Sequence, residues 1–311
     1  MTDRDGTKIA STPSNSRLEF RNVSMTFPDG TEALKEVSFS VDAGEFVTVV
    51  GPSGCGKSTL LRIASNLETN TGGKCSIDRN SIGYVFQDAT LMPWASVAAN
   101  VRLPLDLAGV PRDQADARVA AALHRVGLSR FGSHRPRELS GGQKQRVCIA
   151  RALAVQPDFL VCDEAVAALD VSVQAQIVNL LQDLQRDMGL TYLFIAHDLS
   201  VVRHISDRVA VMYLGKIVEV AEKRTIYASP QHPYTRALIA AVPAPHPSQR
   251  SRGKREHIAG DIPSALNPPS GCRFHTRCPH VMPICREAAP SLIETQPGHQ
   301  VACHLMTEAK A

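Results

Sequence analysis

The sequence predicts an α/β protein with a largely parallel central β-sheet. Runs of β-branched and aromatic residues bounded by turn residues recur between residues 17 and 230, as is typical of strands. In the later part of this region a strand, a helix and a strand follow one another, which favours parallel pairing. The expected strands are Leu18–Phe27, Glu36–Val41, Phe46–Val50, Ile82–Phe86, Phe159–Cys162, Tyr192–Ala196 and Arg208–Leu214.

Two further elements flank this alternation. The strands before Asp42 are expected to form an N-terminal antiparallel β-subdomain, with the turn Asp42-Ala43-Gly44 leading to the third strand. An Ala-rich helical stretch from about residue 93 to 155 predicts an inserted helical subdomain. The clearest helical periodicity follows it, and Gly189 is placed to end that helix. Its apolar positions are Ile177, Leu180, Leu181, Leu184 and Met188.

The composition is that of a soluble globular chain, with 21% charged and 43% hydrophobic residues among 311. No run of about 18 apolar residues is present, so the chain is not expected to span a membrane. The polar N-terminus, with Asp3 and Asp5, is no secretory signal. We therefore expect a cytosolic protein whose cysteines stay reduced. The net charge of +4 is too small to argue for a nucleic-acid partner.

Proline and histidine usage changes near residue 230. Twelve of the twenty prolines and seven of the eleven histidines lie at or after Pro230. We expect residues 1–16 to be a disordered tail, 17–230 the main domain, and 231–311 a separate extension. The extension is interpreted as an amphipathic stretch (Tyr234–Val242), a linker (Pro243–Arg255) and a Cys/His-rich end.

A phosphate loop lies between the strand Phe46–Val50 and an apolar helix that begins near Lys57. Its sequence fits G-x-x-x-x-G-K-[ST], in which glycines let the backbone wrap a polyphosphate and the helix N-terminus attracts its oxygens. We expect Lys57 to reach the β- and γ-phosphates and Ser58 to ligate Mg²⁺. A chance match in a Gly-rich turn is the alternative. The loop predicts a P-loop NTPase with a RecA-like parallel sheet, and its nucleotide-binding candidates are Gly51, Pro52, Ser53, Gly54, Cys55, Gly56, Lys57, Ser58 and Thr59.

Acidic residues and a histidine follow two later strands. Asp163 and Glu164 come directly after Phe159–Cys162, and His197 follows Tyr192–Ala196. Asp163 is expected to hold Mg²⁺ through water, Glu164 to orient or deprotonate the attacking water, and His197 to reach the γ-phosphate. Alone, the Asp-Glu pair is as typical of a helix N-cap, and a single histidine of a structural residue.

A third motif, Leu139-Ser140-Gly141-Gly142-Gln143, opens another helix. Ser140 is a good N-cap, and the glycines expose backbone N–H groups, which makes a second anion site. Here the chain resembles the ATP-binding cassette (ABC) ATPases, whose signature is LSGGQ. The resemblance covers about residues 17–230, with six motifs in the family's order. They are the phosphate loop, Gln87, the signature, Asp163-Glu164, Ala168-Leu169-Asp170 and His197.

The resemblance implies a composite ATP site in which two cassettes pair head to tail. Lys57, Ser58 and Asp163 would then hold MgATP, Gln87 would contact the metal and the water, and Glu164 would be the base. The signature residues Ser140, Gly141, Gly142 and Gln143 would meet the ATP of the partner. Phe27 matches the aromatic residue that stacks on adenine, although an ordinary core phenylalanine is nearly as plausible there.

Different parts of the chain resemble two different subfamilies. Residues 17 to about 139 look like the ATPases of nitrate, sulfonate and taurine importers, and the part from Gly141 onward looks like oligopeptide and dipeptide importer ATPases. The chain is interpreted as an importer ATPase for peptides at the cytoplasmic face of the inner membrane. Its implied partners are two transmembrane permease subunits, whose coupling helix would dock between Gln87 and Ser140, a second ATPase subunit and an extracytoplasmic solute-binding protein. A nitrate, sulfonate or taurine importer and a soluble non-transport ABC ATPase are the alternatives.

Four cysteines cluster in the extension: Cys272, Cys278, Cys285 and Cys303. Their spacing lacks the C-x₂-C pairs of zinc ribbons. Four thiols are compatible with a [4Fe–4S] cluster, and peptide importer ATPases are similar here. Zinc, with His275, His280 or His304 as extra ligands, and plain buried thiols are the alternatives.

Overall fold

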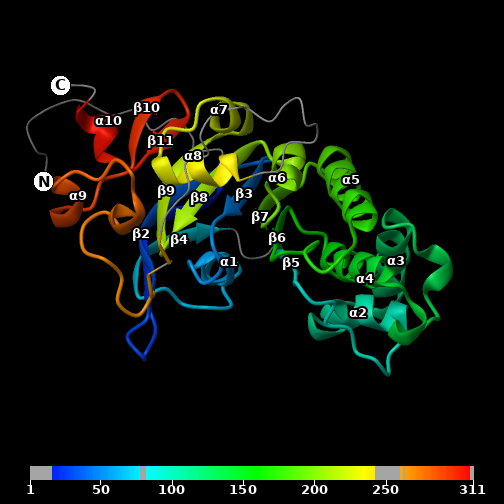
Figure 1. The fold of residues 1–311 in the computed structure, drawn as a ribbon. Helices are drawn as coiled ribbons and strands as arrows, with labels where there is room; N and C mark the ends of the chain where they lie inside the picture. Colours follow the sequence, from blue (N-terminus) through cyan, green and yellow to red (C-terminus); the bar gives the residue numbers. More distant parts are fainter. Residues whose placement is uncertain (1–15, 78–81, 242–259, 262, 309–311) are drawn as a thin grey trace, which may run out of the picture.

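The computed structural model describes residues 16–77, 82–241, 260–261 and 263–308, which fold into two β-sheets with helices around them (Figure 1). The predicted N-terminal tail and the linker Pro243–Arg255 lie outside the described residues, except that Ser16 is the first residue of strand β1.

The smaller sheet is antiparallel and has the strand order β2-β1-β4. Its strands are β1 (Ser16–Thr26), β2 (Glu32–Asp42) and β4 (Gly72–Ile77). The prediction of antiparallel pairing between the first two strands is confirmed by a register that joins Phe20 to Phe39. Strand β4 was missed, because its sequence Gly-Gly-Lys-Cys-Ser-Ile has little apolar or β-branched character.

The larger sheet has eight strands in the order β10-β11-β9-β8-β3-β7-β6-β5. The pairs β5–β6, β6–β7, β7–β3 and β3–β8 are parallel, as expected, whereas β9, β10 and β11 pair antiparallel. The strands are β3 (Phe46–Val50), β5 (Ile82–Val85), β6 (Phe159–Cys162), β7 (Thr191–Ile195), β8 (Arg208–Tyr213), β9 (Lys216–Glu222), β10 (Ile293–Gln296) and β11 (His299–Val301).

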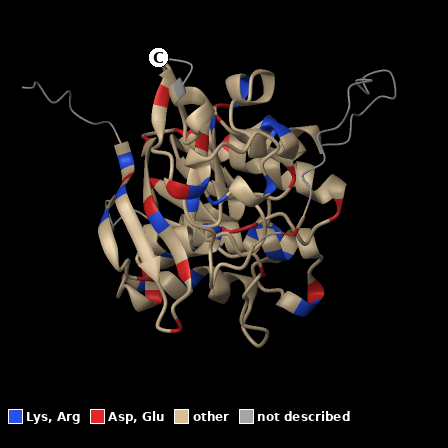
Figure 2. Ribbon diagram, turned by 60° about the vertical axis from the view of Figure 1, so that its left-hand side comes forward, with Lys and Arg blue, Asp and Glu red and all other residues tan. Residues whose placement is uncertain are grey.

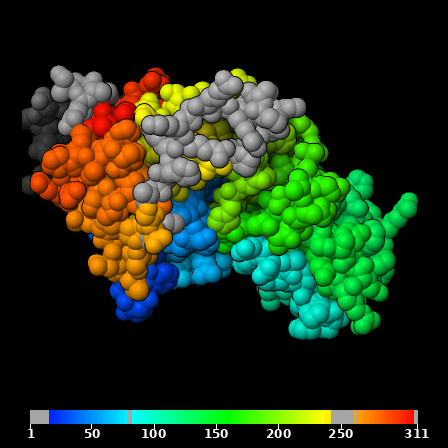
Figure 3. All heavy atoms as spheres, viewed as in Figure 1, coloured from blue at the N-terminus to red at the C-terminus, as the bar shows by residue number. Residues whose placement is uncertain are grey.

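The C-terminal extension is therefore built into the main sheet. Residues Gln300 and Val301 of β11 pair with Val220 and Glu219 of β9. In Figure 3 the extension lies against the N-terminal sheet, on the side of the molecule away from helices α2 and α3. Its helices are α8 (Pro233–Ala240), α9 (Ile284–Glu287) and α10 (His304–Glu308).

Three helices form a separate group at the right of Figure 1: α2 (Val97–Leu107), α3 (Arg112–Arg125) and α4 (Gly141–Ala154). They contact one another more than they contact the sheets. Short 3₁₀ turns at Ser129–Phe131 and Pro136–Glu138 connect α3 to α4. The helical stretch expected over residues 93–155 is thus three helices with irregular connections, and Figure 3 shows the surface hollowed between this group and the N-terminal sheet.

The remaining helices follow the strands of the main sheet. Helix α5 (Val171–Met188) begins at its N-cap Asp170, whose carboxylate accepts the N–H of Val173, and ends at Gly189 with φ of 66°. That left-handed conformation suits glycine, as expected. The others are α1 (Lys57–Ala64), α6 (Leu199–Ile205) and α7 (Lys223–Ala228). Figure 2 shows basic and acidic residues interspersed along the ribbon, in keeping with the small net charge.

Successive side chains of the central strands point to opposite faces of the sheet, and they contribute to two hydrophobic cores, one on each face. Phe46 of β3 and Phe194 of β7 belong to the core that includes helices α2 to α5, while Val47 and Leu193 belong to the core shared with the N-terminal sheet and α1. Burial on both faces fixes β3 rigidly. The loop after β3 therefore starts from a well-anchored strand end, where ligands of open α/β sheets bind.

Candidate functional site

The phosphate loop joins β3 to α1. Lys57 is buried, and its Nζ donates hydrogen bonds to the carbonyl oxygens of Gly51 (3.0 Å) and Pro52 (2.8 Å). Gly56 has φ of 102°, and a Cβ there would lie 2.3 Å from the carbonyl oxygen of Ala33. No side chain caps the first turn of α1, and no acidic residue lies in it. The loop thus presents uncapped backbone N–H groups and a lysine, a combination suited to an anion.

Ser58 and Asp163 meet across the sheet, as the sequence predicts for a metal site. The Ser58 hydroxyl donates to Oδ1 of Asp163 over 3.2 Å. Burial raises the pKa of the Asp163 carboxyl, partly offset by this hydrogen bond, and the neighbouring charge of Glu164 raises it further. Two oxygen ligands converging on one point fit Mg²⁺, which prefers hard oxygen donors.

Tyr84 is a member of this site that sequence reasoning missed. Its hydroxyl donates to Oδ2 of Asp163 over 3.3 Å. Burial and the charge of Asp163 raise the pKa of Tyr84, so the phenol stays protonated and can donate. Tyr84 lies in β5 and pairs in register with Val161 of β6, two residues before Asp163. This register, which the sequence alone does not reveal, brings the two side chains together.

Glu164 and His197 are brought together at the ends of the adjacent strands β6 and β7. The Nε2 atom of His197 contacts Oε1 of Glu164 directly. The Glu164 side chain is 13% exposed and that of His197 41%. Glu164 has φ of 48°, a conformation that non-glycine residues adopt rarely and that clusters at functional sites.

Gln87 lies beyond the end of β5 and is exposed. Its side chain forms no hydrogen bond with another residue in the described part of the chain. The neighbouring Phe86 packs its ring 4.3 Å from that of Tyr84, centre to centre. The link between this segment and the site is therefore the contact of Phe86 with Tyr84, and the side chain of Gln87 makes no such contact.

The signature motif stands apart, at the start of α4. Ser140 caps the helix: its Oγ accepts the N–H of Gln143, and Gln143 Oε1 accepts the N–H of Ser140. Ser140 and Gly141 are exposed. A Cβ at Gly142 would lie 2.5 Å from Cγ1 of Val173 in α5, whereas one at Gly141 would meet Leu169 at an ordinary 3.6 Å. Close packing thus requires glycine at 142.

Phe27 follows β1 and is half-buried against the core shared with the N-terminal sheet. Its backbone N–H donates to Thr31 across a tight turn. The ring thus has a core role, and its stacking on adenine stays a prediction.

The four cysteines of the extension lie close enough to interact electrostatically, Cys303 with each of the other three. All four are free thiols. Burial raises the pKa of Cys272 and of Cys303 to about 11. Across the residues that the structure describes, no group of three or more His, Cys, Asp or Glu side chains is arranged to hold a metal ion. The predicted [4Fe–4S] cluster and the zinc alternative thus find no support.

Comparison with known proteins agrees with this geometry. Residues 34–167 match the family model described as "ABC transporter", and residues 218–285 match "Oligopeptide/dipeptide transporter, C-terminal region". A putative oligopeptide transport ATP-binding protein YkfD of Bacillus subtilis is 44% identical, with 94% of this chain and 96% of that protein covered. The chain belongs to the ATP-binding proteins of ABC transporters.

Further relatives agree with this ABC assignment. The oligopeptide transport ATP-binding protein AppF of Bacillus subtilis is also 44% identical, with 93% of this chain and 97% of that protein covered. The ATP-binding cassette MJ0796, solved as a dimer with ADP and phosphate, is 34% identical with a TM-score of 0.61, covering 67% of this chain and 99% of that one. This ABC ATP-binding protein is an ATPase. None of its described helices is long and apolar enough to cross a membrane.

Proposed function

We propose that this protein is the ATP-hydrolysing subunit of an ABC importer that takes up oligopeptides or dipeptides. The observation that carries the proposal is the convergence of Ser58, Asp163, Glu164 and His197 at the carboxyl ends of β3, β6 and β7. The peptide class is supported by the names of the relatives that match along nearly the whole chain. Those relatives cover both parts of the sequence, which favours peptides over nitrate, sulfonate or taurine; the likeness of residues 17–139 to those importers stays a prediction.

At the ATP site, the phosphate loop Gly51–Thr59 binds the polyphosphate through its backbone N–H groups. Lys57, now bonded to Gly51 and Pro52, exchanges those carbonyls for phosphate oxygens. Ser58 and Asp163 would hold Mg²⁺, directly and through water, and the bound ion neutralises charge on the phosphates. Tyr84 keeps the Asp163 carboxylate oriented.

Glu164 is proposed as the group that accepts a proton from the attacking water. The contact with His197 supports an oriented carboxylate, and the imidazole is proposed to turn toward the γ-phosphate when nucleotide binds. Gln87, which is exposed after the end of β5, is proposed to contact the metal and the water. Because phosphoryl transfer depends mainly on positioning and charge neutralisation, these fixed groups are the principal means of catalysis.

The signature residues are proposed to complete the ATP site of a second subunit. The exposed, capped start of α4 offers backbone N–H groups at Gly141 and Gly142 to an anion. The helix points this end outward beside α5, whose first residue Val171 is 82% exposed. An exposed apolar residue next to an exposed anion site fits a surface that a partner ATPase covers.

Permease subunits are proposed to dock between Gln87 and Ser140. In that segment two large apolar side chains stand in solvent, Trp94 at 72% and Leu107 at 80% exposure. We propose that these two side chains belong to the surface that the permease covers. The protein would therefore sit peripherally at the cytoplasmic face of the inner membrane, and an extracytoplasmic binding protein would deliver the peptide. We further propose residues 17–230 as the ATP-binding domain and 231–311 as its extension.

The test is ATP hydrolysis by the complex in lipid vesicles. Co-expressed with candidate permease subunits and reconstituted in vesicles, the protein is expected to hydrolyse ATP faster when a peptide-loaded binding protein is added, and the vesicles are expected to accumulate labelled peptide. Stimulation by taurine or nitrate in place of peptide would contradict the substrate class. ATP hydrolysis with no transport of any solute would favour the soluble, non-transport alternative.

A further inference from the structure

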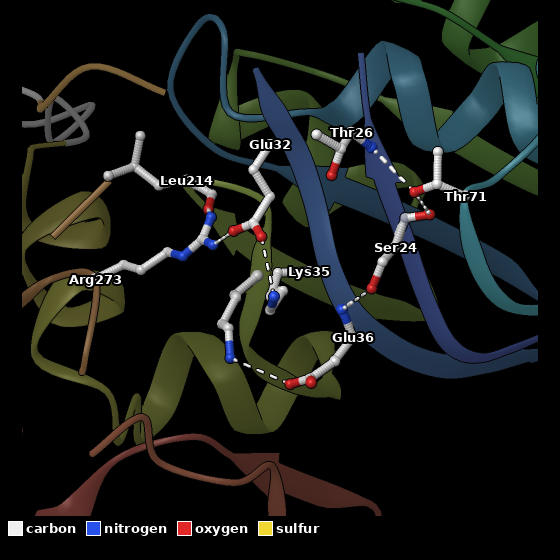
Figure 4. A network of polar contacts seen from close by, with 9 residues as sticks. Ser24, Thr26, Glu32, Lys35, Glu36, Thr71, Leu214 and Arg273 are labelled. Carbon is white, nitrogen blue, oxygen red and sulfur yellow. Dashed lines mark hydrogen bonds and ion pairs between the residues drawn. The ribbon is translucent and has the colours of Figure 1, made fainter. Parts of the chain in front are cut away.

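A buried arginine of the C-terminal extension contacts the N-terminal sheet. Arg273 is 8% exposed, and its guanidinium donates to the carboxylate of Glu32 in β2 and to the carbonyl oxygen of Leu214 in the β8–β9 turn (Figure 4). These partners lie 241 and 59 residues away in the sequence. A guanidinium can serve two acceptors at fixed angles, so one side chain fixes the two segments relative to each other.

The two segments that Arg273 joins, the start of β2 and the β8–β9 turn, also pack against the phosphate loop. The N–H of Gly215 donates to the carbonyl oxygen of Cys55 over 2.8 Å, and the N–H of Lys35 donates to Gly215 over 2.9 Å. A Cβ at Gly56 would lie 2.3 Å from the carbonyl oxygen of Ala33. Both segments that Arg273 binds therefore touch the loop backbone directly.

The turn at Leu214 and Gly215 depends on its partners. Both residues have positive φ, 42° and 77°. A non-glycine residue keeps this conformation only where surrounding contacts compensate for its cost. The bond from Arg273 to the Leu214 carbonyl is such a contact, and a Cβ at Gly215 would lie 3.1 Å from Nη1 of Arg273. Loss of the guanidinium would leave that carbonyl without its donor and the turn free to relax.

Neighbouring charges and aromatic packing hold Arg273 in this position. Glu32 is also bound by Lys35 at 3.0 Å (Figure 4). On the same strand, Glu36 pairs with Lys216 at 3.7 Å. The next residue, Phe274, is buried among aromatic rings, 5.3 Å from that of Tyr213, and anchors the backbone of the arginine. The guanidinium is thus held in place from both ends.

We propose that Arg273 is a positioning residue for the phosphate loop. Through Glu32 and the Leu214–Gly215 turn it holds the loop in the conformation that receives nucleotide phosphates, so the extension is a working part of the ATP site. The inference rests on the proposed function, because it requires that the loop bind nucleotide. It predicts a loss of phosphate affinity when the guanidinium is removed, even in protein that remains folded.

The experiment measures MgADP binding to the full chain by calorimetry, since ADP reports on the loop without hydrolysis. Arg273→Ala is expected to raise the Kd about fivefold. Arg273→Lys, which keeps the charge but serves fewer acceptors, is expected to fall between that variant and the unaltered chain. Glu32→Gln is expected to weaken binding in the same direction. The matched control is Arg286→Ala, an exposed arginine of the same extension, which is expected to bind normally.

Each variant is measured well below its own unfolding midpoint, so that a purely structural role would leave the Kd unchanged. Folded Arg273→Ala with a normal Kd would overturn the inference. If that variant does not fold, Arg273→Lys and Glu32→Gln decide in its place, and normal affinity in both would overturn it. Absence of MgADP binding in the unaltered chain would instead overturn the proposed nucleotide site itself, whatever Arg273 does.

Discussion

The imidazole of His197 contacts the carboxylate of Glu164 at the ends of the neighbouring strands β6 and β7. The two residues are 33 positions apart in sequence, yet parallel pairing of their strands, with Cys162 beside Phe194, brings them together. A carboxylate held by a neighbouring imidazole at a strand end is suited to general-base chemistry.

Glu164→Gln is expected to preserve MgATP binding and to lower the ATPase rate by at least about a hundredfold, because an amide cannot accept the proton of water. The measurement is steady-state phosphate release alongside MgATP binding. Asp187→Asn is the matched control, since Asp187 is exposed in the last turn of α5. An ATPase rate in Glu164→Gln equal to that of the control would remove Glu164 from the mechanism.

Tyr84→Phe removes one of the two side-chain donors that hold Asp163. Loss of a hydrogen bond to a charged group costs about 1.5 kcal/mol, so the Mg²⁺ concentration that gives half-maximal ATPase activity is expected to rise about tenfold. Tyr227→Phe is the control, because it removes a tyrosine hydroxyl bound to the carbonyl of Leu199, away from Asp163. Equal Mg²⁺ requirements in the two variants would contradict the assignment.

Gly142→Ala is expected to lower the free energy of unfolding by about 1–3 kcal/mol, because the added methyl would overlap Val173. Gly141→Ala faces only an ordinary contact with Leu169 and is expected to be nearly neutral in stability. Urea unfolding of both variants and of Gly142→Ala/Val173→Ala tests this. The double variant should recover stability relative to Gly142→Ala; no recovery would show that the cost lies elsewhere.

The strands of the main sheet could be predicted from the sequence because they are short apolar runs buried on both faces. Phe46–Val50 and Phe159–Cys162 match the observed β3 and β6 residue for residue. Strand β9 was missed, although it is nearly fully buried: the last strand expected from the sequence ends at Leu214, one residue before Gly215 in the turn between β8 and β9.

Site residues that lie in recognisable motifs could be proposed from the sequence, including Asp163 and His197, which meet Ser58 and Glu164 from distant segments. Local spacing sufficed for Lys57 and Ser58, since a loop and a helix start lie within a few residues. Arg273 lies in no such motif, and its acceptors Glu32 and Leu214 are 241 and 59 residues away in the sequence, so the contact follows from how the extension packs in the folded chain. Strand order across a sheet is a property of the whole chain.

His232 gives the protein a defined response to acid. It is fully buried at the N-cap of α8, where Nδ1 accepts the N–H of Tyr234 and its own backbone N–H donates to Glu219. Burial, and then the charge of Arg236, lower its pKa from 6.5 to about 3. Below pH 6.5 the unfolded chain therefore binds a proton that the folded chain does not, and stability falls as the pH decreases toward 3.

Between pH 6.5 and pH 5 this single group is expected to remove about 2 kcal/mol from the free energy of unfolding. The measurement is urea unfolding at both pH values for the unaltered chain and for His232→Asn. Asparagine can still cap α8 but does not titrate, so the variant should lose about 2 kcal/mol less over the same interval. Parallel pH dependence in the two proteins would mean that His232 is not the group responsible, because removing its titration would then have left the acid response of folding unchanged.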